Sequence, residues 1–387
     1  MKDDFIPFHK AEIGHEEKQA VLRVLESGWL TTGTEALEFE REFAQFVKSK
    51  FAFAVNSATA GLMLCYAAVK SEKRNKILTT PYTFTSTANA ALHAGCEVCY
   101  ADIEADSFNL DPIQAEKVLD KEKSVCALVP VHFGGNPCNM EKLNRLAKEN
   151  SIAVIEDAAH SFPSETSMGF AGTLGDAGVF SFYATKTITT GEGGMVCTNN
   201  ERIGDFVKKM RLHGIDRDVW NRYTAKNASW LYDVTDCGHK CNLSDVLATI
   251  GRQQLRKAGD FLEKRKAIAA FYDEAFSPCS FLKIPPTGEG NSYHLYPLRL
   301  NLEALKITRD EFAAKMQECG VGISVHFIPH FLLSFWKNRY NLDPRDFPNA
   351  HKAFLSEISL PIFPQMTQNQ REKTVDTVIK LGRTYER

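Results

Sequence analysis

The stretch "SFYATKTITTGEGGMV" (residues 181–196) places one lysine, Lys186, between a run of β-forming residues and a glycine-rich turn. Small hydroxyl residues surround this lysine, and no acidic residue adjoins it in the sequence. An amine that reacts as a nucleophile must lose its proton, and an adjacent carboxylate would stabilise the charged form instead. The stretch therefore indicates chemistry carried out by an uncharged lysine amine.

Short apolar segments on both sides of this stretch are rich in Val, Ile and Ala, which is typical of strands buried on both faces. They are residues 51–55, 76–80, 97–103, 126–132, 152–157, 177–183 and 194–198. Helical patterns alternate with them, as in "NMEKLNRLAKEN" (139–150), where apolar residues recur at helical spacing. The alternation predicts an α/β fold in which helices cover a mainly parallel, seven-stranded sheet.

The 387 residues exceed what one hydrophobic core usually supports, so we expect two domains. The predicted large domain is residues 1–250, with an N-terminal arm, and residues 251–387 form a linker helix and a smaller C-terminal α+β domain. The helical pattern of residues 244–276 is so long that we expect it to break into two helices. A loop is predicted at "IPPTGEGN" (284–291), and a strand at "HLYPLRL" (294–300).

Composition excludes several classes of protein. Hydrophobic residues make up 44%, charged residues 24%, and the formal net charge is -2, so the basic excess of a nucleic-acid-binding protein is missing. No apolar stretch approaches the roughly 20 residues that span a bilayer, and the start of the chain has no apolar signal segment. We therefore expect a cytoplasmic protein that binds small molecules and its own copies.

Ten cysteines are scattered along the chain, and we expect free thiols because disulfide scaffolds belong to short secreted chains. Cys96 and Cys99 lie in a predicted strand and are interpreted as packing residues. Cys237 and Cys241 lack the further ligands that a zinc site needs, so no metal site is predicted.

The segment "AVNSATAGLML" (54–64) begins as a strand, turns through small hydroxyl residues and enters an apolar helix. The backbone N–H groups of residues 57–60 then lack intrahelical partners, and the helix dipole adds about half a positive charge there. This end of a helix attracts an anion such as phosphate, to which Thr59 adds a hydroxyl donor. A serine or threonine cap without a ligand is the alternative.

The segment "IAVIEDAAHS" (152–161) ends a buried strand with Glu156 and Asp157, followed by His160. Ligands bind at the carboxyl ends of the strands in a parallel sheet. Taken singly, an acid here caps the next turn and the histidine is structural. Together with a phosphate-binding turn and Lys186, they indicate a cofactor site.

Pyridoxal phosphate needs an amine, an acid for its pyridine nitrogen, an aromatic face and an anion site. Lys186, Asp157, Phe84 in "PYTFTSTANA" (81–90) and the turn at residues 57–60 supply these four features. Ser181 is a further donor for the phosphate. The sequence therefore predicts pyridoxal phosphate as the cofactor.

A series of motifs resembles the DegT/DnrJ/EryC1/StrS sugar aminotransferases, which have the aspartate aminotransferase fold (fold type I). The motifs follow the family's order over nearly the whole chain: "SGWLTTG" (27–33), "NSATAGL", "PYTFTSTANA", "VPVHFGG", "IEDAAHS", "SFYATKTITTGEGGMV", "RLHGI", "NLSDVLATIG" and "VHFIPH". The resemblance implies a homodimer with each active site at the subunit interface. It also implies that the enzyme uses pyridoxal phosphate to move an amino group, typically from glutamate, to a keto-sugar attached to a nucleotide.

By this resemblance, Lys186 forms the Schiff base and shuttles the proton, and Asp157 pairs with the pyridine nitrogen. Phe84 stacks on the ring, and His160 lies near the ring hydroxyl. The residues implied to hold the phosphate are Ala58, Thr59, Ala60 and Ser181, together with Asn242 from the partner subunit. The residues implied to contact the sugar nucleotide are Trp29, Leu30, Thr31 and His326.

One branch of the family has histidine in place of the lysine and removes a sugar hydroxyl, so Lys186 favours amino transfer. The segments "RLHGIDRDVWNRY" (211–223) and "GHKCN" (238–242) look most like the branch that includes UDP-4-amino-4-deoxy-L-arabinose aminotransferase, which suggests amination at sugar C4. The family usually has aromatic residues where His239 and Cys241 stand, so the packing around Asn242 and Lys240 is expected to differ.

Other readings stay open. A deoxysugar dehydratase or lyase uses the same cofactor, and a cofactor-binding regulatory protein would keep the fold without the activity. A nicotinamide-dependent dehydrogenase is disfavoured because no G-x-G-x-x-G motif follows an early strand. His132 is interpreted as a structural histidine, and "DRDVWNRY" (216–223) as either a solvated loop or a contact for the nucleotide.

Overall fold

The computed structural model describes residues 5–216, 232–286 and 288–387. Its central sheet has seven strands in the order β1-β9-β8-β5-β4-β2-β3. The strands are β1 (Phe51–Val55), β2 (Lys76–Thr79), β3 (Glu97–Tyr100), β4 (Val125–Leu128), β5 (Ala153–Asp157), β8 (Ala177–Ser181) and β9 (Gly194–Thr198). Only β9 runs antiparallel to its neighbours, β1 and β8, while the other adjacent pairs are parallel. The predicted, mainly parallel, seven-stranded sheet is confirmed.

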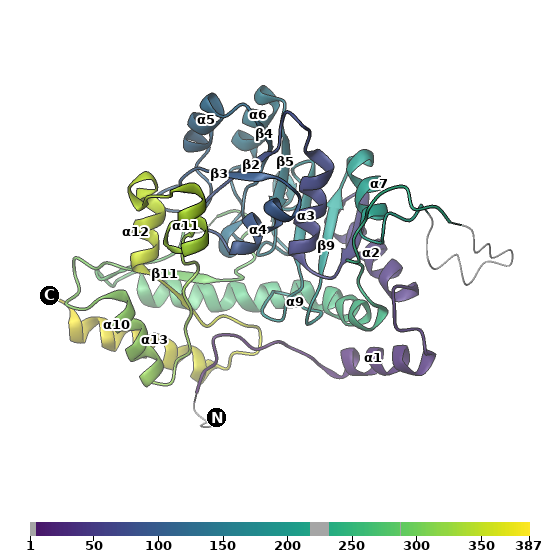
Figure 1. Ribbon diagram of the computed structural model, residues 1–387. Helices are drawn as coiled ribbons and strands as arrows, with labels where there is room; N and C mark the ends of the chain where they lie inside the picture. The colour runs from purple at the N-terminus through teal and green to yellow at the C-terminus, as the bar shows by residue number, and fades with distance from the viewer. Residues whose placement is uncertain (1–4, 217–231, 287) are drawn as a thin grey trace.

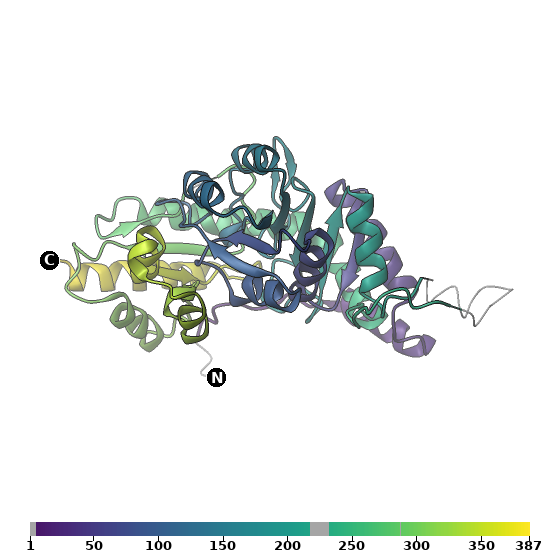
Figure 2. The same ribbon diagram turned by 45° about the horizontal axis from the view of Figure 1, so that its top comes forward.

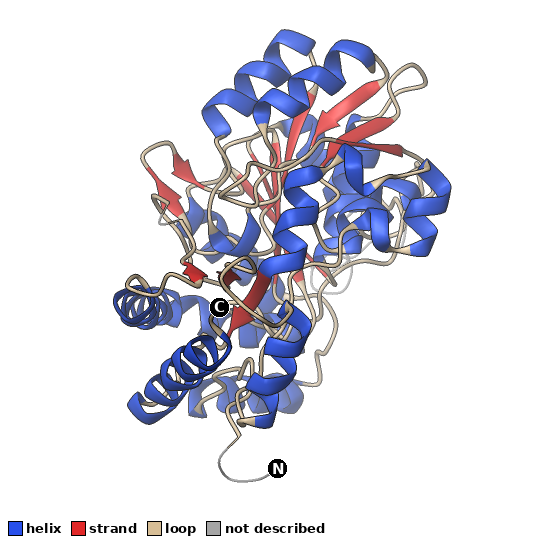
Figure 3. Ribbon diagram, turned by 90° about the vertical axis from the view of Figure 1, so that its left-hand side faces the viewer, coloured by secondary structure: helices blue, strands red, loops and turns tan. Residues whose placement is uncertain are grey.

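Helices cover both faces of this sheet (Figures 1 and 3). They are α2 (Thr34–Val47), α3 (Ala58–Val69), α4 (Thr85–His93), α5 (Pro112–Lys121), α6 (Met140–Asn150) and α7 (Glu201–Met210). Successive residues of a strand point to opposite faces. Accordingly, Phe53 and Val55 of β1 join the core beneath α3, whereas Ala52 and Ala54 join the core beneath α2. This two-sided burial explains the near-continuous apolar strands.

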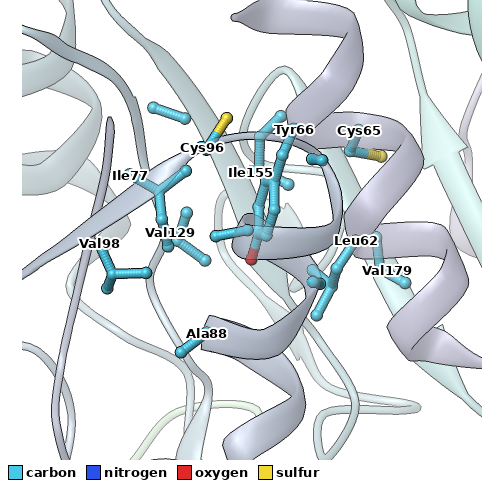
Figure 4. Close-up of a cluster of buried hydrophobic side chains, with 14 of the residues drawn as sticks. Leu62, Cys65, Tyr66, Ile77, Ala88, Cys96, Val98, Val129, Ile155 and Val179 are labelled. Carbon is cyan, nitrogen blue, oxygen red and sulfur yellow. The ribbon is translucent and has the colours of Figure 1, made fainter. Parts of the chain in front are cut away.

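The core beneath α3 and α4 is shown in Figure 4, where Leu62 and Tyr66 of α3 pack among strand residues such as Ile155 and Val179. Cys96 lies in this core, and Cys99 packs against a neighbouring cluster, as their reading as packing residues predicts. All ten cysteines are free thiols.

A second, antiparallel sheet has the order β10-β11-β12 and lies near the C-terminus (Figures 1 and 2). Its strands are β10 (Leu282–Lys283), β11 (Tyr296–Leu300) and β12 (Glu357–Leu360), which confirms the strand predicted in "HLYPLRL". The helices α10 (Arg309–Glu318) and α13 (Gln368–Tyr385) pack in the core of this sheet, whereas α11 (Ser334–Tyr340) and α12 (Pro348–Ser356) contribute Trp336, Ala350 and Ala353 to the core beneath α3. Two short strands, β6 (Glu165–Thr166) and β7 (Gly169–Phe170), form a hairpin elsewhere in the chain.

The prediction of two helices between residues 244 and 276 is wrong, because a single helix of 32 residues, α9 (Asp245–Phe276), occupies this range. Isolated long helices are marginal, and packing normally stabilises them. The first half of α9 packs in the core beneath α2, and the second half packs in the core of the antiparallel sheet. Both halves are therefore held in one continuous helix, which runs along the molecule (Figure 1). The predicted domain boundary at residue 250 falls within this helix and stays a prediction.

The N-terminal arm runs across the C-terminal part of the chain before it reaches α1 (His15–Ser27) (Figure 1). Ile6 donates its N–H to the carbonyl of Gly320 at 2.9 Å and accepts from the N–H of Gly322 at 2.8 Å. Among the described residues, no helix has the length and apolar character needed to cross a membrane.

Asp245, the first residue of α9, caps the start of α2. Its carboxylate accepts the N–H groups of Gly33 at 2.7 Å, Ala36 at 3.0 Å and Glu35 at 3.2 Å. Because a capping side chain contributes about 0.5–2 kcal/mol, Asp245→Ala is expected to lower the free energy of unfolding by about 2 kcal/mol in a urea titration. The control is Asp260→Ala on the same helix, where an exposed pair with Lys264 contributes at most about 1 kcal/mol. Equal losses in the two variants would contradict the cap.

Candidate active site

Lys186 lies in the turn that follows β8, and hydroxyl side chains hold this turn in place. Thr187 donates its hydroxyl to the carbonyl of Phe162, and Thr189 donates to the carbonyl of Phe182 at 3.0 Å. Gly191, whose positive φ of 85° favours glycine, donates its N–H to the hydroxyl of Thr189 at 2.8 Å. The small hydroxyl residues around Lys186 are therefore explained as ties that fix the backbone of the turn.

Asp157 ends β5, the strand next to β8, and is 4% exposed. Its Oδ2 accepts the hydroxyl of Thr87 at 2.8 Å, and its Oδ1 accepts the N–H of Ala159 at 3.2 Å. Burial raises the pKa of Asp157, which the hydrogen bonds and the charge of Lys186 oppose. Burial also lowers the pKa of Lys186 to about 8, and Asp157 acts in the opposite direction. The two side chains thus interact electrostatically in one buried region.

The predicted phosphate-binding turn lies beside Ser181. Ser57 is the N-cap of α3, and its hydroxyl accepts the N–H of Ala60 at 3.2 Å. Gly194 of β9 pairs with Val55 on one side and with Ser181 on the other. A Cβ on Gly194 would lie 2.8 Å from the backbone nitrogen of Ala58, so only glycine permits this approach. The structure therefore brings Ser181 and the start of α3, which includes Ala58, Thr59 and Ala60, to one edge of the sheet.

Aromatic and imidazole rings form a layer in which Phe327 contacts the others. Its ring centroid lies 5.9 Å from that of Phe84, 5.6 Å from that of His160 and 5.0 Å from that of His326. Phe84, the N-cap residue of α4, is 57% exposed and leaves a ring available for stacking. Phe84, His160 and His326 are therefore close together although they come from distant parts of the sequence.

His160 and His326 are held as neutral rings. The Nδ1 of His160 accepts the N–H of Gly134 at 3.2 Å, so this nitrogen carries no proton. Burial and the charge of Lys186 lower the pKa of His160 well below its usual range, and the same two causes lower the pKa of His326 to about 3. That Lys186 affects both rings shows that they lie within electrostatic reach of its amine.

Glu156 and His132 have a structural role. His132 is fully buried and donates from Nε2 to Glu156 at 2.8 Å, because its Nδ1 already accepts the N–H of Cys138 at 3.0 Å. Glu156 also accepts the N–H groups of Gly172, Leu174 and Gly175, each at 2.7 Å. These bonds hold the segment between β7 and β8, which agrees with the interpretation of His132 as a structural histidine.

The early loop with Trp29, Leu30 and Thr31 lies beside Asn242. Thr31 accepts the N–H of Asp245 at 3.3 Å, and Asn242 donates its amide to the hydroxyl of Thr32 at 2.5 Å. Leu30 is 48% exposed.

Asn242 also forms a bridge with Val55, next to the phosphate-binding turn of its own chain, and its side-chain oxygen accepts from Lys240. Its contribution to a partner's site, and the sugar contacts of the early loop, stay predictions. The segment 217–231, with most of "DRDVWNRY", lies outside the described residues.

The chemistry of these side chains fits pyridoxal phosphate. An amine with a lowered pKa, a buried carboxylate, an available aromatic ring and the N-terminal end of a helix are the four features that the cofactor requires. Among the described residues, no group of three or more His, Cys, Asp or Glu side chains is arranged to hold a metal ion. The fold and the site define a pyridoxal-phosphate-dependent enzyme of fold type I.

Residues 11–379 match the DegT/DnrJ/EryC1/StrS aminotransferase family. The chain belongs to this family, and it is a sugar aminotransferase that uses pyridoxal phosphate. It is similar to the spore coat polysaccharide biosynthesis protein SpsC of Bacillus subtilis, with 37% identity over 97% of each chain. It is also similar to the uncharacterized protein MJ1066 of Methanocaldococcus jannaschii, with 40% identity over 98% of each chain.

Solved structures agree with this assignment. Helicobacter pylori PseC, an aminotransferase involved in the biosynthesis of pseudoaminic acid, superposes with a TM-score of 0.91 and 29% identity, over 99% of this chain and 100% of its own. Spr1654 of Streptococcus pneumoniae superposes in its PLP form with a TM-score of 0.89 and 26% identity, over 98% of this chain and 99% of its own.

Sequence reasoning missed several residues of the site. Thr87 lies three positions after Phe84, but Phe84 is the extended N-cap of α4, so helical spacing gave no signal that Thr87 binds Asp157. His294, whose ring centroid is 4.4 Å from that of His160, and Phe327 were missed as well. Contacts between residues more than 100 positions apart are set by the tertiary fold alone.

Proposed function

We propose that this enzyme transfers the amino group of glutamate to a nucleotide-linked keto-sugar, at C4, as a cytoplasmic homodimer with shared active sites. The lowered pKa of Lys186 beside the buried Asp157 is the observation that carries the amino-transfer chemistry. The early loop and the likeness of residues 211–223 to C4 aminotransferases support the choice of acceptor. SpsC is a polysaccharide biosynthesis protein and PseC is involved in pseudoaminic acid biosynthesis, which supports an amino sugar made for a surface polysaccharide or glycoconjugate.

In this proposal the N–H groups at the start of α3, together with Thr59 and Ser181, would hold the phosphate of the cofactor. Phe84 would supply the aromatic face for its ring, and His160 would contact its ring hydroxyl. Asp157, kept ionised by the hydroxyl of Thr87 and by the ring, holds the proton on the pyridine nitrogen. When bound, pyridoxal phosphate carries the amino group between substrates and withdraws electrons from the carbon that loses or gains a proton.

Lys186 is the proposed base and acid. With a pKa of about 8, about one amine in ten is uncharged at pH 7, compared with about one in 3,000 at the usual pKa of 10.5. Its Nζ removes the α-proton of glutamate in the first half-reaction. In the second half-reaction it delivers a proton to the sugar carbon that receives nitrogen. His326 and the early loop contact the acceptor sugar.

The test is to incubate the purified protein with ¹⁵N-glutamate and a panel of UDP-, GDP- and dTDP-4-keto-6-deoxy sugars plus a UDP-4-keto-pentose. We expect ¹⁵N in one sugar product by mass spectrometry, together with 2-oxoglutarate. Loss of a sugar hydroxyl without nitrogen transfer would instead identify a dehydratase. A panel in which no member gains nitrogen would contradict the nucleotide-sugar proposal.

A further inference from the structure

His326 is connected to a buried carboxyl group through one hydroxyl. The Nδ1 of His326 lies 2.8 Å from Oγ of Ser359, and this hydroxyl also bonds Oε1 of Glu357. The second carboxyl oxygen, Oε2, accepts the backbone N–H of His326 at 2.9 Å. Glu357 and Ser359 are two residues apart on β12, so both side chains point to the same face of the strand. The three residues therefore form a closed hydrogen-bonded ring.

Of these three hydrogen-bonded residues, only His326 reaches the surface of the protein. Glu357 and Ser359 are 0% exposed, whereas His326 is partly exposed. Among the described residues, Nε2 of His326 has no hydrogen-bond partner, and the ring packs against Phe327 in the layer that also holds Phe84. Nε2 is thus the nitrogen of His326 that these bonds leave for another group to contact.

The directions of the bonds follow from the position of one proton. When Glu357 is ionised, Ser359 donates to it, so Nδ1 of His326 must donate to Ser359 and Nε2 carries a lone pair. When Glu357 is protonated, its Oε1–H donates to Ser359, because Oε2 is already the acceptor of an N–H. The hydroxyl of Ser359 then donates to Nδ1, and the imidazole proton lies on Nε2. When Glu357 gains a proton, the Glu357–Ser359 and Ser359–His326 hydrogen bonds therefore both reverse their direction.

The charges around Glu357 come from three directions. Arg309 of α10 donates to the backbone carbonyl of Glu357 at 3.0 Å, and Arg299 of β11 and Tyr82 also face the carboxyl group. Burial raises the pKa of Glu357 to about 8, and the bond from Ser359 and the two arginines oppose this rise. The carboxyl group therefore changes its charge close to neutral pH.

Besides Glu357, the titratable groups near His326 include Lys186, His160 and His294, and the hydroxyl of Tyr82 donates to the carbonyl of His326 at 2.7 Å. Burial and Lys186 lower the pKa of His326 to about 3, so this ring stays neutral throughout the range in which Glu357 titrates. A neutral imidazole can present either a donor or an acceptor at a given nitrogen, and its tautomer decides which.

We propose that Glu357 and Ser359 are positioning residues that set the tautomer of His326. With a protonated Glu357, the imidazole presents an N–H donor at Nε2 toward the site, and with an ionised Glu357 it presents an acceptor there. The consequence for the acceptor sugar, whose oxygen atoms accept from the N–H donor, rests on the proposed function.

The tautomer is measured directly, without substrate, by ¹H–¹⁵N correlation spectra of the holoenzyme labelled with ¹⁵N-histidine. The chain has 11 histidines, and the signals of His326 are those absent from His326→Asn. In the wild type we expect the Nε2–H form at low pH and the Nδ1–H form at high pH, with a midpoint near pH 8. A tautomer that stays the same from about pH 6 to pH 10 would overturn the proposal.

Two variants separate this effect from general destabilisation. In Glu357→Gln, the amide oxygen accepts the backbone N–H and the amide N–H₂ donates to Ser359, so the Nε2–H form is expected at every pH. Ser359→Ala removes the hydroxyl that links Glu357 to His326, so we expect no pH midpoint in the tautomer of His326. The control is Ser356→Ala, which removes a buried hydroxyl that donates to the backbone carbonyl of Lys352 at 2.9 Å and should keep the wild-type midpoint. A midpoint that persists in Glu357→Gln would contradict the assignment.

The effect on the reaction is read from KM for the acceptor sugar. We expect this KM to rise about three- to tenfold above pH 8 in the wild type, the usual effect of one hydrogen bond, and to stay constant in Glu357→Gln. Ionisation of Lys186 changes kcat equally in the wild type and in Glu357→Gln. Comparing the two proteins at the same pH therefore cancels its effect. A constant KM in the wild type would contradict the role toward the sugar. Because the spectra need no turnover, they decide the tautomer even if the panel shows no aminotransferase activity.

Discussion

Replacement of Lys186 by alanine is expected to abolish measurable amination, with kcat lower by a factor of at least about 10⁴. In the proposed function, the variant lacks both the amine that binds the cofactor covalently and the group that moves the proton. Lys186→Arg keeps a positive charge, but a guanidinium stays protonated and cannot serve as a base, so it should be equally inactive. The rates are measured by mass spectrometry of the ¹⁵N-labelled sugar. Amination within tenfold of the wild type would exclude the proposed role.

The covalent link gives a second readout of the same prediction. Borohydride reduction of the wild-type holoenzyme, followed by proteolysis, should place a reduced pyridoxyl group on the peptide that contains Lys186. The control residue is Lys240, which bonds Asn242 beside the phosphate-binding turn and should remain unmodified. An adduct on another lysine, or none at all, would show that the amine in the turn after β8 is not the attachment point.

Asp157→Ala is expected to lower kcat by a factor of a few hundred to a few thousand. Removing one partner of a buried charge pair costs about 3–5 kcal/mol, and here the remaining partner would be the pyridinium nitrogen. Without the carboxylate this nitrogen loses its proton and the ring withdraws electrons less strongly. Asp157→Asn should be similarly slow because the amide carries no charge. The measurement is kcat for amination, with the cofactor absorbance recorded as a check of occupancy.

Asp102→Asn is the matched control for Asp157. Asp102 is also a buried carboxylate, but it accepts the N–H groups of Ile103 at 2.9 Å, Asn349 at 2.9 Å and Ala350 at 3.0 Å, so it caps α12. Its replacement should lower the melting temperature while leaving kcat of the folded enzyme near the wild-type value. If Asp157→Ala turned over at the same rate as Asp102→Asn, the carboxylate at the end of β5 would have no role in the reaction.

The amino-acid sequence by itself determined the seven strands of the large sheet, its mainly parallel character and the position of Lys186 after a buried strand. These features are local, because strand burial is visible in runs of apolar residues, and the capped turn at residues 57–60 is visible in its small hydroxyl residues. The series of motifs also identified the family, which the match over residues 11–379 confirms.

Tertiary structure decided the rest. The helix α9 is continuous because two separate hydrophobic cores hold its two halves, and no pattern within residues 244–276 reveals those cores. Likewise, Glu357 and Ser359 reach His326 only because β12 passes beside the loop at residue 326. Local propensity depends on neighbours in sequence, whereas the tautomer of His326 depends on a carboxyl group that the fold buries 31 residues away along the chain.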